Sequence, residues 1–330
     1  MMDRRGFVGT VAATLLAIPL AGEAQQPGRI YRLGVLSLNA RPTSDGGLNQ
    51  WLTTYLRELG YVEGQNLVVE ARFAEGQYDR LAGLAREIAL IKPDVIVAIG
   101  TSAIQEGKLA TTTVPIVFLT NVDPVAAGLV PSLAQPGGNV TGILIAPEGT
   151  LAGKKLELLR EFVPRAKRIA LLAPDDPGIG FRLQREEVRK AAASLGVELI
   201  VVTVQGGDYA GAFAAIGAAR AAALFVGAHS VFLRDRKQII GLAAKYRLPA
   251  IYEWPQHVKD GGLMSYGASD TETYRRVAVY VDRIFKGARP SELPIEQPSK
   301  LLLVINFNTA KALGLTLPQS LLLRADEVIQ

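Results

Sequence analysis

The stretch Pro93-Asp94-Val95-Ile96-Val97-Ala98-Ile99-Gly100-Thr101-Ser102 decides how this chain folds. The uninterrupted apolar run 95–99 predicts a strand that is buried on both faces, as strands of parallel sheets are. Pro93 stands just before the run, where a missing amide donor does little harm. Gly100 then leads directly into a helical pattern over 102–110. A buried strand followed at once by a helix is typical of the α/β class.

The same strand–helix alternation fills the first half of the chain. It predicts strands at 31–38, 67–73, 95–99, 116–119 and 140–145, with helices at 47–59, 78–91 and 102–110. The alternation restarts later, although no residue-level repeat is visible. This second series predicts strands at 168–173, 197–204, 224–226 and 250–252, with helices at 180–195, 209–222 and 232–246. Two similar series predict two doubly wound, Rossmann-like lobes, each with a small parallel sheet.

The end of the chain is too short for a third domain. It holds a predicted strand at 263–266, a helix at 273–286 and an apolar stretch at 301–306. We therefore expect the chain to cross back between the lobes near Ala146, Tyr266 and Ser291, so that the crossings form a hinge around a cleft. The predicted first lobe is 30–145 plus about 266–290, and the predicted second lobe is 146–265 plus about 291–330.

Residues 1–24 resemble an export signal. Arg4 and Arg5 give the positive start, 7–20 is an apolar run too short to span a bilayer, and 21–24 offers small residues for cleavage. The sequence therefore predicts a periplasmic protein. Arg4-Arg5-Gly6-Phe7-Val8 also resembles a twin-arginine signal. Because ordinary secretory signals often start with two basic residues, both export routes stay open.

Composition excludes several classes of function. The net charge of +5 is dispersed along the chain without a basic run, which gives no case for binding nucleic acid. The chain has no cysteine and only two histidines, His229 and His257. Thiol catalysis, thiolate zinc sites and histidine-rich metal sites are therefore excluded. We expect no cofactor and no metal.

Several segments, in this order and spacing, resemble a known family. They are 60–66 (GYVEGQN), 93–101 (PDVIVAIGT), 115–118 (PIVF), 123–130 (DPVAAGLV) and 136–142 (PGGNVTG). From about Ile30 to near Gly314 the chain is similar to the substrate-binding proteins of ABC transporters with the type I periplasmic binding fold, in the tryptophan-binding lipoprotein branch. The resemblance implies a two-lobed, ligand-closing receptor that delivers a small organic solute to a membrane permease as a monomer. Relatives bind aromatic amino acids, but 225–230 and 252–254 differ here, so the solute stays open.

The residues after the predicted strands define a candidate ligand site. In open α/β sheets, ligands bind beyond the carboxyl ends of the strands, where loops and helix N-termini meet. These positions carry polar groups but no catalytic pair. The candidates are Ser37, Asn39, Thr101, Ser102, Thr120, Asn121, Asp123, His229, Ser230, Glu253, Trp254, Tyr266 and Asp270.

Two of the candidate groups have a specific chemistry. Thr101 and Ser102 could hold a ligand carboxylate at a helix N-terminus, or could cap their own helix. Asp123 before Pro124 could accept a ligand ammonium, or could form an Asp-Pro turn.

The aromatic and acidic residues of the second lobe leave similar alternatives. Trp254 beside Glu253 could stack on a cationic or aromatic ligand, or could simply pack. Asp175-Asp176-Pro177-Gly178 is interpreted as a turn, and His257 as a surface residue. Trp51 is expected in the core or at the edge of the cleft.

The main alternative is a secreted hydrolase on the same fold that uses Asp123, Glu253 or Asp270. However, the chain has no phosphate loop, no G-x-G-x-x-G, no G-x-S-x-G and no H-E-x-x-H motif. The effector domain of a transcription regulator would need a DNA-binding segment where the export signal lies. We therefore predict a binding protein and no catalytic residue.

Overall fold

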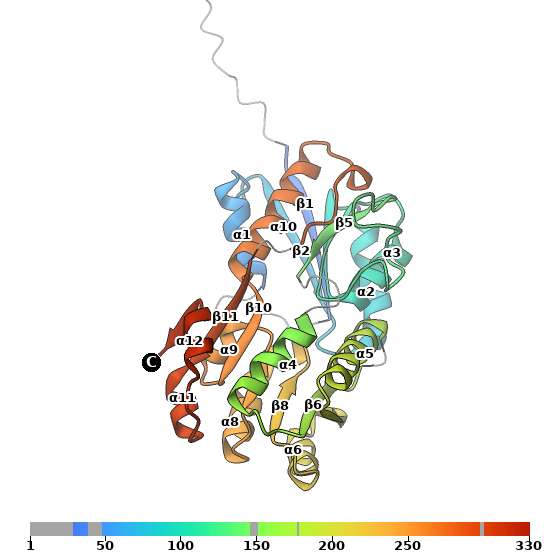
Figure 1. Ribbon diagram of the computed structural model, residues 1–330. Coiled ribbons are helices and arrows are strands. Elements are labelled where there is room, and N and C mark those ends of the chain that lie inside the picture. Colours follow the sequence, from blue (N-terminus) through green and yellow to red (C-terminus); the bar gives the residue numbers. More distant parts are fainter. Residues whose placement is uncertain (1–28, 39–47, 146–150, 177, 298–299) are drawn as a thin grey trace, which may run out of the picture.

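The computed structural model describes residues 29–38, 48–145, 151–176, 178–297 and 300–330 (Figure 1). The predicted export signal and Asn39 lie outside these residues. None of the helices in the described part of the chain has the length and apolarity needed to span a bilayer.

The first lobe is a five-stranded parallel sheet with the order β2-β1-β3-β4-β5. Its strands are β1 (Tyr31–Ser37), β2 (Leu67–Phe73), β3 (Val95–Ile99), β4 (Ile116–Thr120) and β5 (Val140–Leu144). Helices α1 (Leu48–Glu58) and α10 (Asp270–Phe285) cover one face, and α2 (Tyr78–Leu90) and α3 (Thr101–Ala110) cover the other. The apolar runs form strands because both faces of this sheet are buried against helices.

The second lobe is a seven-stranded sheet with the order β12-β11-β10-β9-β8-β6-β7, and only the β10–β11 pair is antiparallel. Its strands are β6 (Arg168–Pro174), β7 (Glu198–Val204), β8 (Ala223–Val226), β9 (Ala250–Tyr252), β10 (Met264–Ala268), β11 (Leu301–Asn306) and β12 (Glu327–Ile329). Its helices are α4 (Leu151–Phe162), α5 (Ile179–Ser194), α6 (Tyr209–Ala218), α7 (Ser230–Arg234), α8 (Arg236–Lys245), α9 (Pro255–Lys259), α11 (Phe307–Ala312) and α12 (Gln319–Arg324). The predicted α/β class with two doubly wound lobes is confirmed.

The chain passes between the lobes more than once. Strand β10 belongs to the second sheet, but α10, which follows it, packs on the first. The chain then stays on the first lobe through Glu296, whose backbone N–H donates to Gly142 O at 3.1 Å. It returns with β11 to the second sheet. The last return therefore comes after Glu296, a few residues later than the crossing expected near Ser291.

Two local predictions were wrong. The helix expected over 232–246 is divided at Asp235, whose carboxylate accepts hydrogen bonds from Tyr209 Oη and the Arg234 guanidinium. His257, interpreted as a surface residue, is only 1% exposed. Pro255 begins α9, and this short helix brings the imidazole into stacking contact with Tyr252, with 4.6 Å between the ring centroids. Trp51 is partly exposed, at 37%.

Candidate functional site

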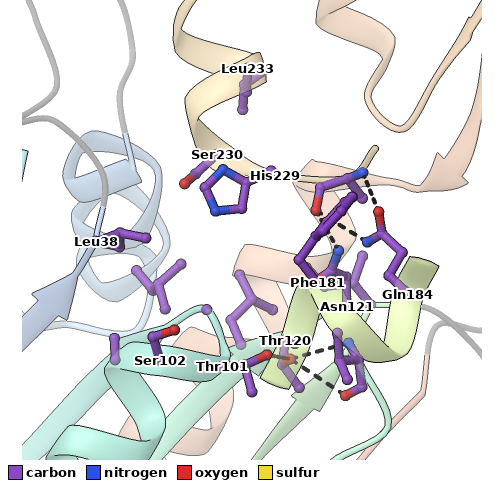
Figure 2. Close-up of a pocket in the computed structure, with 18 of the residues that line it drawn as sticks. Leu38, Thr101, Ser102, Thr120, Asn121, Phe181, Gln184, His229, Ser230 and Leu233 are labelled. Carbon is purple, nitrogen blue, oxygen red and sulfur yellow. Dashed lines mark hydrogen bonds between the residues drawn. The ribbon is translucent and has the colours of Figure 1, made fainter. Parts of the chain in front are cut away.

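A pocket lies between the two lobes at the carboxyl ends of their strands (Figure 2). The first lobe contributes the β3–α3 and β4 ends, and the second lobe contributes the β6–α5 and β8–α7 connections. The polar side chains that line the pocket are Tyr78, Thr101, Ser102, Thr120, Asn121, Asp176, Gln184, His229, Ser230, Thr273 and Tyr274. Within the described ranges, no cluster of His, Asp or Glu side chains is placed to hold a metal ion.

The N-terminus of α3 forms the first-lobe wall of the pocket. Gly100 adopts φ 87°, which a residue with a Cβ rarely adopts, and turns the chain from β3 into α3. Gly100 is also the N-cap residue of α3. The alternative that Thr101 or Ser102 caps this helix is therefore wrong. The Thr101 hydroxyl instead lies 3.2 Å from the Thr120 hydroxyl. The first amides of α3, which have no partner within the helix, therefore lie at the pocket wall beside the two hydroxyls.

The N-terminus of α5 faces α3 from the second lobe. Asp176, at the end of the β6 connection, accepts a hydrogen bond from Gly178 N–H at 2.6 Å, and α5 begins at Ile179. Gly180 and Phe181 of its first turn line the pocket. Two helix N-termini, one from each lobe, therefore meet at the same cavity, and both favour negative charge.

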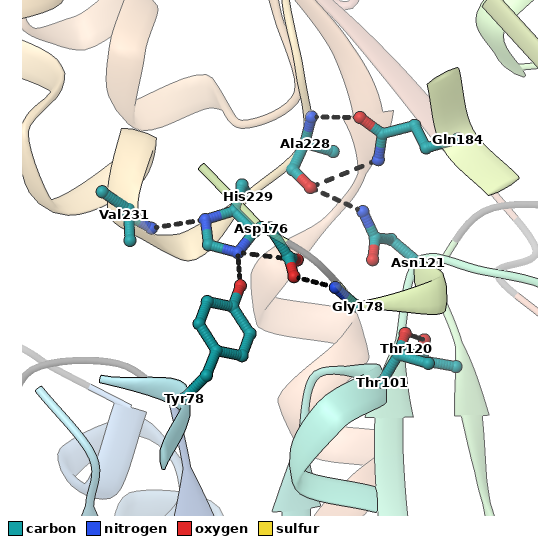
Figure 3. Close-up of polar contacts among 10 residues, drawn as sticks. All are labelled: Tyr78, Thr101, Thr120, Asn121, Asp176, Gly178, Gln184, Ala228, His229 and Val231. Carbon is teal, nitrogen blue, oxygen red and sulfur yellow. Dashed lines mark hydrogen bonds and ion pairs between the residues drawn. The ribbon is translucent and has the colours of Figure 1, made fainter. Parts of the chain in front are cut away.

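A hydrogen-bonded group of Tyr78, Asp176 and His229 joins the lobes (Figure 3). Val231 N–H donates to His229 Nδ1 at 3.3 Å, so in the neutral imidazole the ring proton lies on Nε2. Nε2 lies 2.9 Å from Tyr78 Oη of the first lobe and 3.5 Å from Asp176 Oδ2 of its own lobe. The position of Asp176 after a second-lobe strand was the signal for a site, but the Asp-Asp-Pro-Gly sequence favoured a turn. In the structure the Asp176 carboxylate accepts from Gly178 N–H and also lines the pocket.

This environment keeps Asp176 ionised. Burial raises the pKa of its carboxyl, but hydrogen bonds from His229, Tyr78 and Gly178 outweigh burial and hold the pKa below its usual value. Burial, together with the neighbouring Asp176 carboxylate, raises the pKa of Tyr78 well above its usual range. At neutral pH, Tyr78 is therefore a protonated hydroxyl and Asp176 a charged acceptor.

A second polar group also bridges the lobes. Asn121 Nδ2 of the first lobe donates to Ala228 O of the second at 3.0 Å. Gln184 holds the backbone of the same residue, because its Nε2 donates to Ala228 O at 3.2 Å and its Oε1 accepts from Ala228 N–H at 2.8 Å. Direct bonds between the lobes show that the described arrangement is closed.

The remaining wall of the pocket is apolar and aromatic. Leu38, Ile99, Phe181, Leu233 and Trp254 contribute most of it. The Trp254 ring is held by stacking on His257, with 6.0 Å between the ring centroids. The pocket thus combines two helix N-termini, one carboxylate and an apolar region.

The structure brings part of the predicted site together. Of the candidates, the pocket contains Thr101, Ser102, Thr120, Asn121, His229, Ser230 and Trp254. Sequence reasoning missed Tyr78, Gln184 and Phe181 because they lie within helices rather than directly after strands.

Four of the candidates whose side chains are described lie outside the lining: Ser37, Asp123, Glu253 and Tyr266. Ser37 is fully buried at the end of β1, and Tyr266 packs against the second-lobe core. Asp123 Oδ1 accepts from Val125 N–H at 2.8 Å, which is the turn that its proline predicted. Glu253 is buried in an ion pair with Lys155. The side chain of Asp270, the first residue of α10, is not among those described.

Fold and site together define a two-lobed protein that closes on a small molecule. Residues 41–329 match the family model of ABC transporter substrate binding proteins, so the chain belongs to this family. It therefore binds a small-molecule solute for an ABC transporter. The hydrolase alternative finds no support, because Asp123 forms a turn and Glu253 is paired away from the pocket.

Comparisons with individual proteins agree with this family. A conserved domain protein from Vibrio cholerae has a similar structure, with a TM-score of 0.82 and 29% identity over 91% of this chain and 100% of that one. An ABC domain from Streptococcus pneumoniae in complex with L-Trp has a TM-score of 0.80 and 25% identity, with the same coverage. A tyrosine-binding protein of Clostridioides difficile is 23% identical over 86% of this chain and 81% of its own length.

Proposed function

We propose that this protein captures an aromatic α-amino acid between its lobes and delivers it to an ABC transporter permease. The observation that carries this proposal is the meeting of the α3 and α5 N-termini at one cavity, beside the Asp176 carboxylate and an apolar wall. An α-amino acid carries an anion and a cation on one carbon, and its side chain would occupy the apolar region.

The carboxylate subsite is assigned to the first turn of α3. Its free amides and the Thr101 and Ser102 hydroxyls can donate to an anion, and the second helix end from α5 adds to the favourable potential. The described side chains of the pocket include no lysine or arginine. In this proposal the helix N-termini and the hydroxyls of Thr101 and Ser102 stabilise the negative charge of the solute carboxylate.

The ammonium subsite is assigned to Asp176. Its carboxylate is ionised at neutral pH and has lone pairs beyond those used by Gly178 and its neighbours. Trp254 and Phe181 provide aromatic faces for the solute side chain. The tyrosine-binding relative and the L-Trp complex support an aromatic amino acid as the first ligand to test.

Replacing Thr101 and Ser102 together with Ala is expected to weaken amino-acid binding by about 1–3 kcal/mol, the range for losing hydrogen bonds to a charged group. The fold should be retained, because neither residue caps α3. Titration calorimetry with L-Trp and L-Tyr measures the change, and the melting temperature without ligand serves as the control. Unchanged affinity in the double variant would remove α3 from the site.

Replacing Asp176 with Asn is expected to weaken binding of L-Trp by about 2 kcal/mol, or roughly 30-fold, because the ammonium loses its charged partner. Indole-3-propionate, which lacks the ammonium, should be affected much less by the same substitution. Equal losses for both compounds would contradict the ammonium subsite and would leave Asp176 only as the partner of Tyr78 and His229.

We also propose that the mature protein is a periplasmic monomer, exported through the segment 1–24. The two closely spaced arginines of this segment support the twin-arginine route as one of two. Fusing 1–24 to a reporter that must fold before export separates the routes. Transport of the folded reporter identifies twin-arginine export, and its retention identifies the general secretory route.

We propose, further, that the lobes rotate about the crossings that follow β5, β10 and Glu296. Closure then buries the solute, and only a solute that contacts both lobes can favour the closed arrangement. For one small solute to contact both lobes, the N-termini of α3 and α5 must approach each other closely.

A further inference from the structure

Two glycines at the start of α5 lie against the first lobe. A Cβ atom built on Gly180 would lie only 2.7 Å from Thr101 Oγ1 and 2.9 Å from Thr101 Cβ. A Cβ on Gly178 would lie 2.7 Å from Asp176 Oδ1 of its own lobe and 3.0 Å from Ser102 Oγ of the first lobe. Ordinary van der Waals contacts between such atoms are longer than these distances. The two helix N-termini therefore touch with no space for a methyl group.

The backbone conformation does not explain these glycines. Gly178 has φ −64° and ψ 154°, which any residue can adopt. Gly180 lies inside α5 and has no positive φ. Alanine is favoured over glycine at a helical position. The requirement for glycine at 180 thus comes from the opposite lobe.

The other bonds between the lobes depend on the same separation. Asn121 Nδ2 to Ala228 O measures 3.0 Å, and Tyr78 Oη to His229 Nε2 measures 2.9 Å. Hydrogen bonds weaken steeply when such distances grow by several tenths of an ångström. Thr101 cannot easily yield, because it is only 7% exposed and its hydroxyl lies against Thr120. A methyl group at 180 would therefore separate the lobes and weaken the bonds on either side.

We infer that Gly180, assisted by Gly178, is a positioning residue that sets how closely the two lobes close on the solute. The inference rests on solute capture in this cleft, as proposed above, but not on which solute is bound. Because apparent affinity falls with the population of the binding-competent state, a residue that blocks closure weakens binding without touching the solute.

The test compares Gly180→Ala with Gly241→Ala, which makes the same change in α8 of the same lobe, where a Cβ would meet nothing within 4 Å. Gly241→Ala should be at least as stable as the wild type, because it places alanine in a helix. In Gly180→Ala the same gain is offset by the weakened hydrogen bonds between the lobes. Only Gly180→Ala should weaken L-Trp binding, by at least about tenfold. A purely structural role for Gly180 would lower stability and leave the affinity for L-Trp unchanged.

Lobe separation provides the second readout. The chain has no cysteine, so spin labels can be placed at Leu90→Cys on α2 and Leu323→Cys on α12, which are 79% and 78% exposed in the wild type. Double electron–electron resonance measures the distance between the two labels. This distance should be short, as in the closed arrangement, in the Gly241→Ala protein with L-Trp. It should be longer in Gly180→Ala, both with and without L-Trp.

The outcomes separate the two proposals. If wild-type protein binds no aromatic amino acid, the ligand class proposed above is wrong, whereas the ligand-free distances still report whether Gly180→Ala opens the lobes. If Gly180→Ala has unchanged label distances and binds within about threefold of the Gly241→Ala control, the positioning role of Gly180 is overturned.

Discussion

Replacing Lys155 with Met is expected to lower the free energy of unfolding by about 3–5 kcal/mol, because it leaves the Glu253 carboxylate buried without its charged partner. The Lys155 Nζ and Glu253 Oε2 atoms form an ion pair whose side chains are only 3% and 2% exposed. Nζ also lies 5.6 Å from the centre of the Phe225 ring. Glu253 immediately precedes Trp254 of the pocket wall, so the loss of this pair should also disturb the aromatic surface.

Urea denaturation followed by circular dichroism measures this change. Lys154→Met is the matched control, because Lys154 directly precedes Lys155 in the same helix. Lys154 pairs with Glu157, and the two side chains are 41% and 51% exposed. That control should change stability by less than about 1 kcal/mol. The double variant Lys155→Met/Glu253→Gln should recover much of the loss, since no buried charge remains. A single variant as stable as wild type would show that the carboxylate finds another partner or water.

The stability of the protein is expected to fall by about 3 kcal/mol between pH 6.5 and pH 4 through His257 alone. Burial lowers the pKa of His257 to about 4, from an ordinary value of 6.5, and this effect outweighs hydrogen bonding to the Trp254 carbonyl. Below pH 6.5 the imidazole of His257 is protonated in the unfolded chain, whereas in the folded protein it stays neutral until the pH falls to about 4. The contribution is therefore fully present above pH 6.5 and is lost as the pH falls through this window.

The control for this prediction is His257→Phe. Phenylalanine keeps the stacking on Tyr252 and removes the His257 Nε2 atom, which is buried without a hydrogen-bond partner among the described residues. Denaturation curves at several pH values should show the His257-dependent slope in the wild type and not in the variant. Parallel pH profiles for the two proteins would indicate that the pKa of His257 is the same in the folded and the unfolded chain.

Much of the fold could be predicted because the sequence marks the strands directly. The strands at 67–73, 95–99 and 250–252 were predicted with their observed limits. Those at 95–99 and 250–252 are apolar runs, which burial on both faces requires. The strand at 67–73 lies at the edge of its sheet and alternates in part, with Glu70 and Arg72 among its apolar residues. Helix α4 was not predicted, although its buried residues Ala152, Leu156 and Leu159 recur at helical spacing. The helices α9, α11 and α12 were not predicted because segments of five or six residues are too short to show an apolar period.

The candidate site could be predicted only in part. The strand-end rule located Thr101, Thr120 and His229, since topology fixes which ends of parallel strands meet. It could not show that Tyr78, 151 residues before His229 in the chain, reaches its imidazole. Nor could it separate Glu253, which turns inward to Lys155, from residues that face the pocket. Those orientations depend on contacts between the lobes and within the core.

The position of α10 has a consequence for the synthesis of the chain. Five strands of the first sheet are complete at Leu144, but their open face is covered by α10, whose Val277, Val281 and Phe285 join its core. Phe285 also stacks on Tyr31 at the start of β1, with 4.4 Å between the rings. While the ribosome is still making the second lobe, α1 is the one described helix available to cover this face, and the apolar surface that α10 later covers stays exposed. The first lobe must therefore finish folding after most of the second lobe has left the ribosome. A nascent chain halted before Asp270 would expose the apolar face of the first sheet to chaperones and proteases.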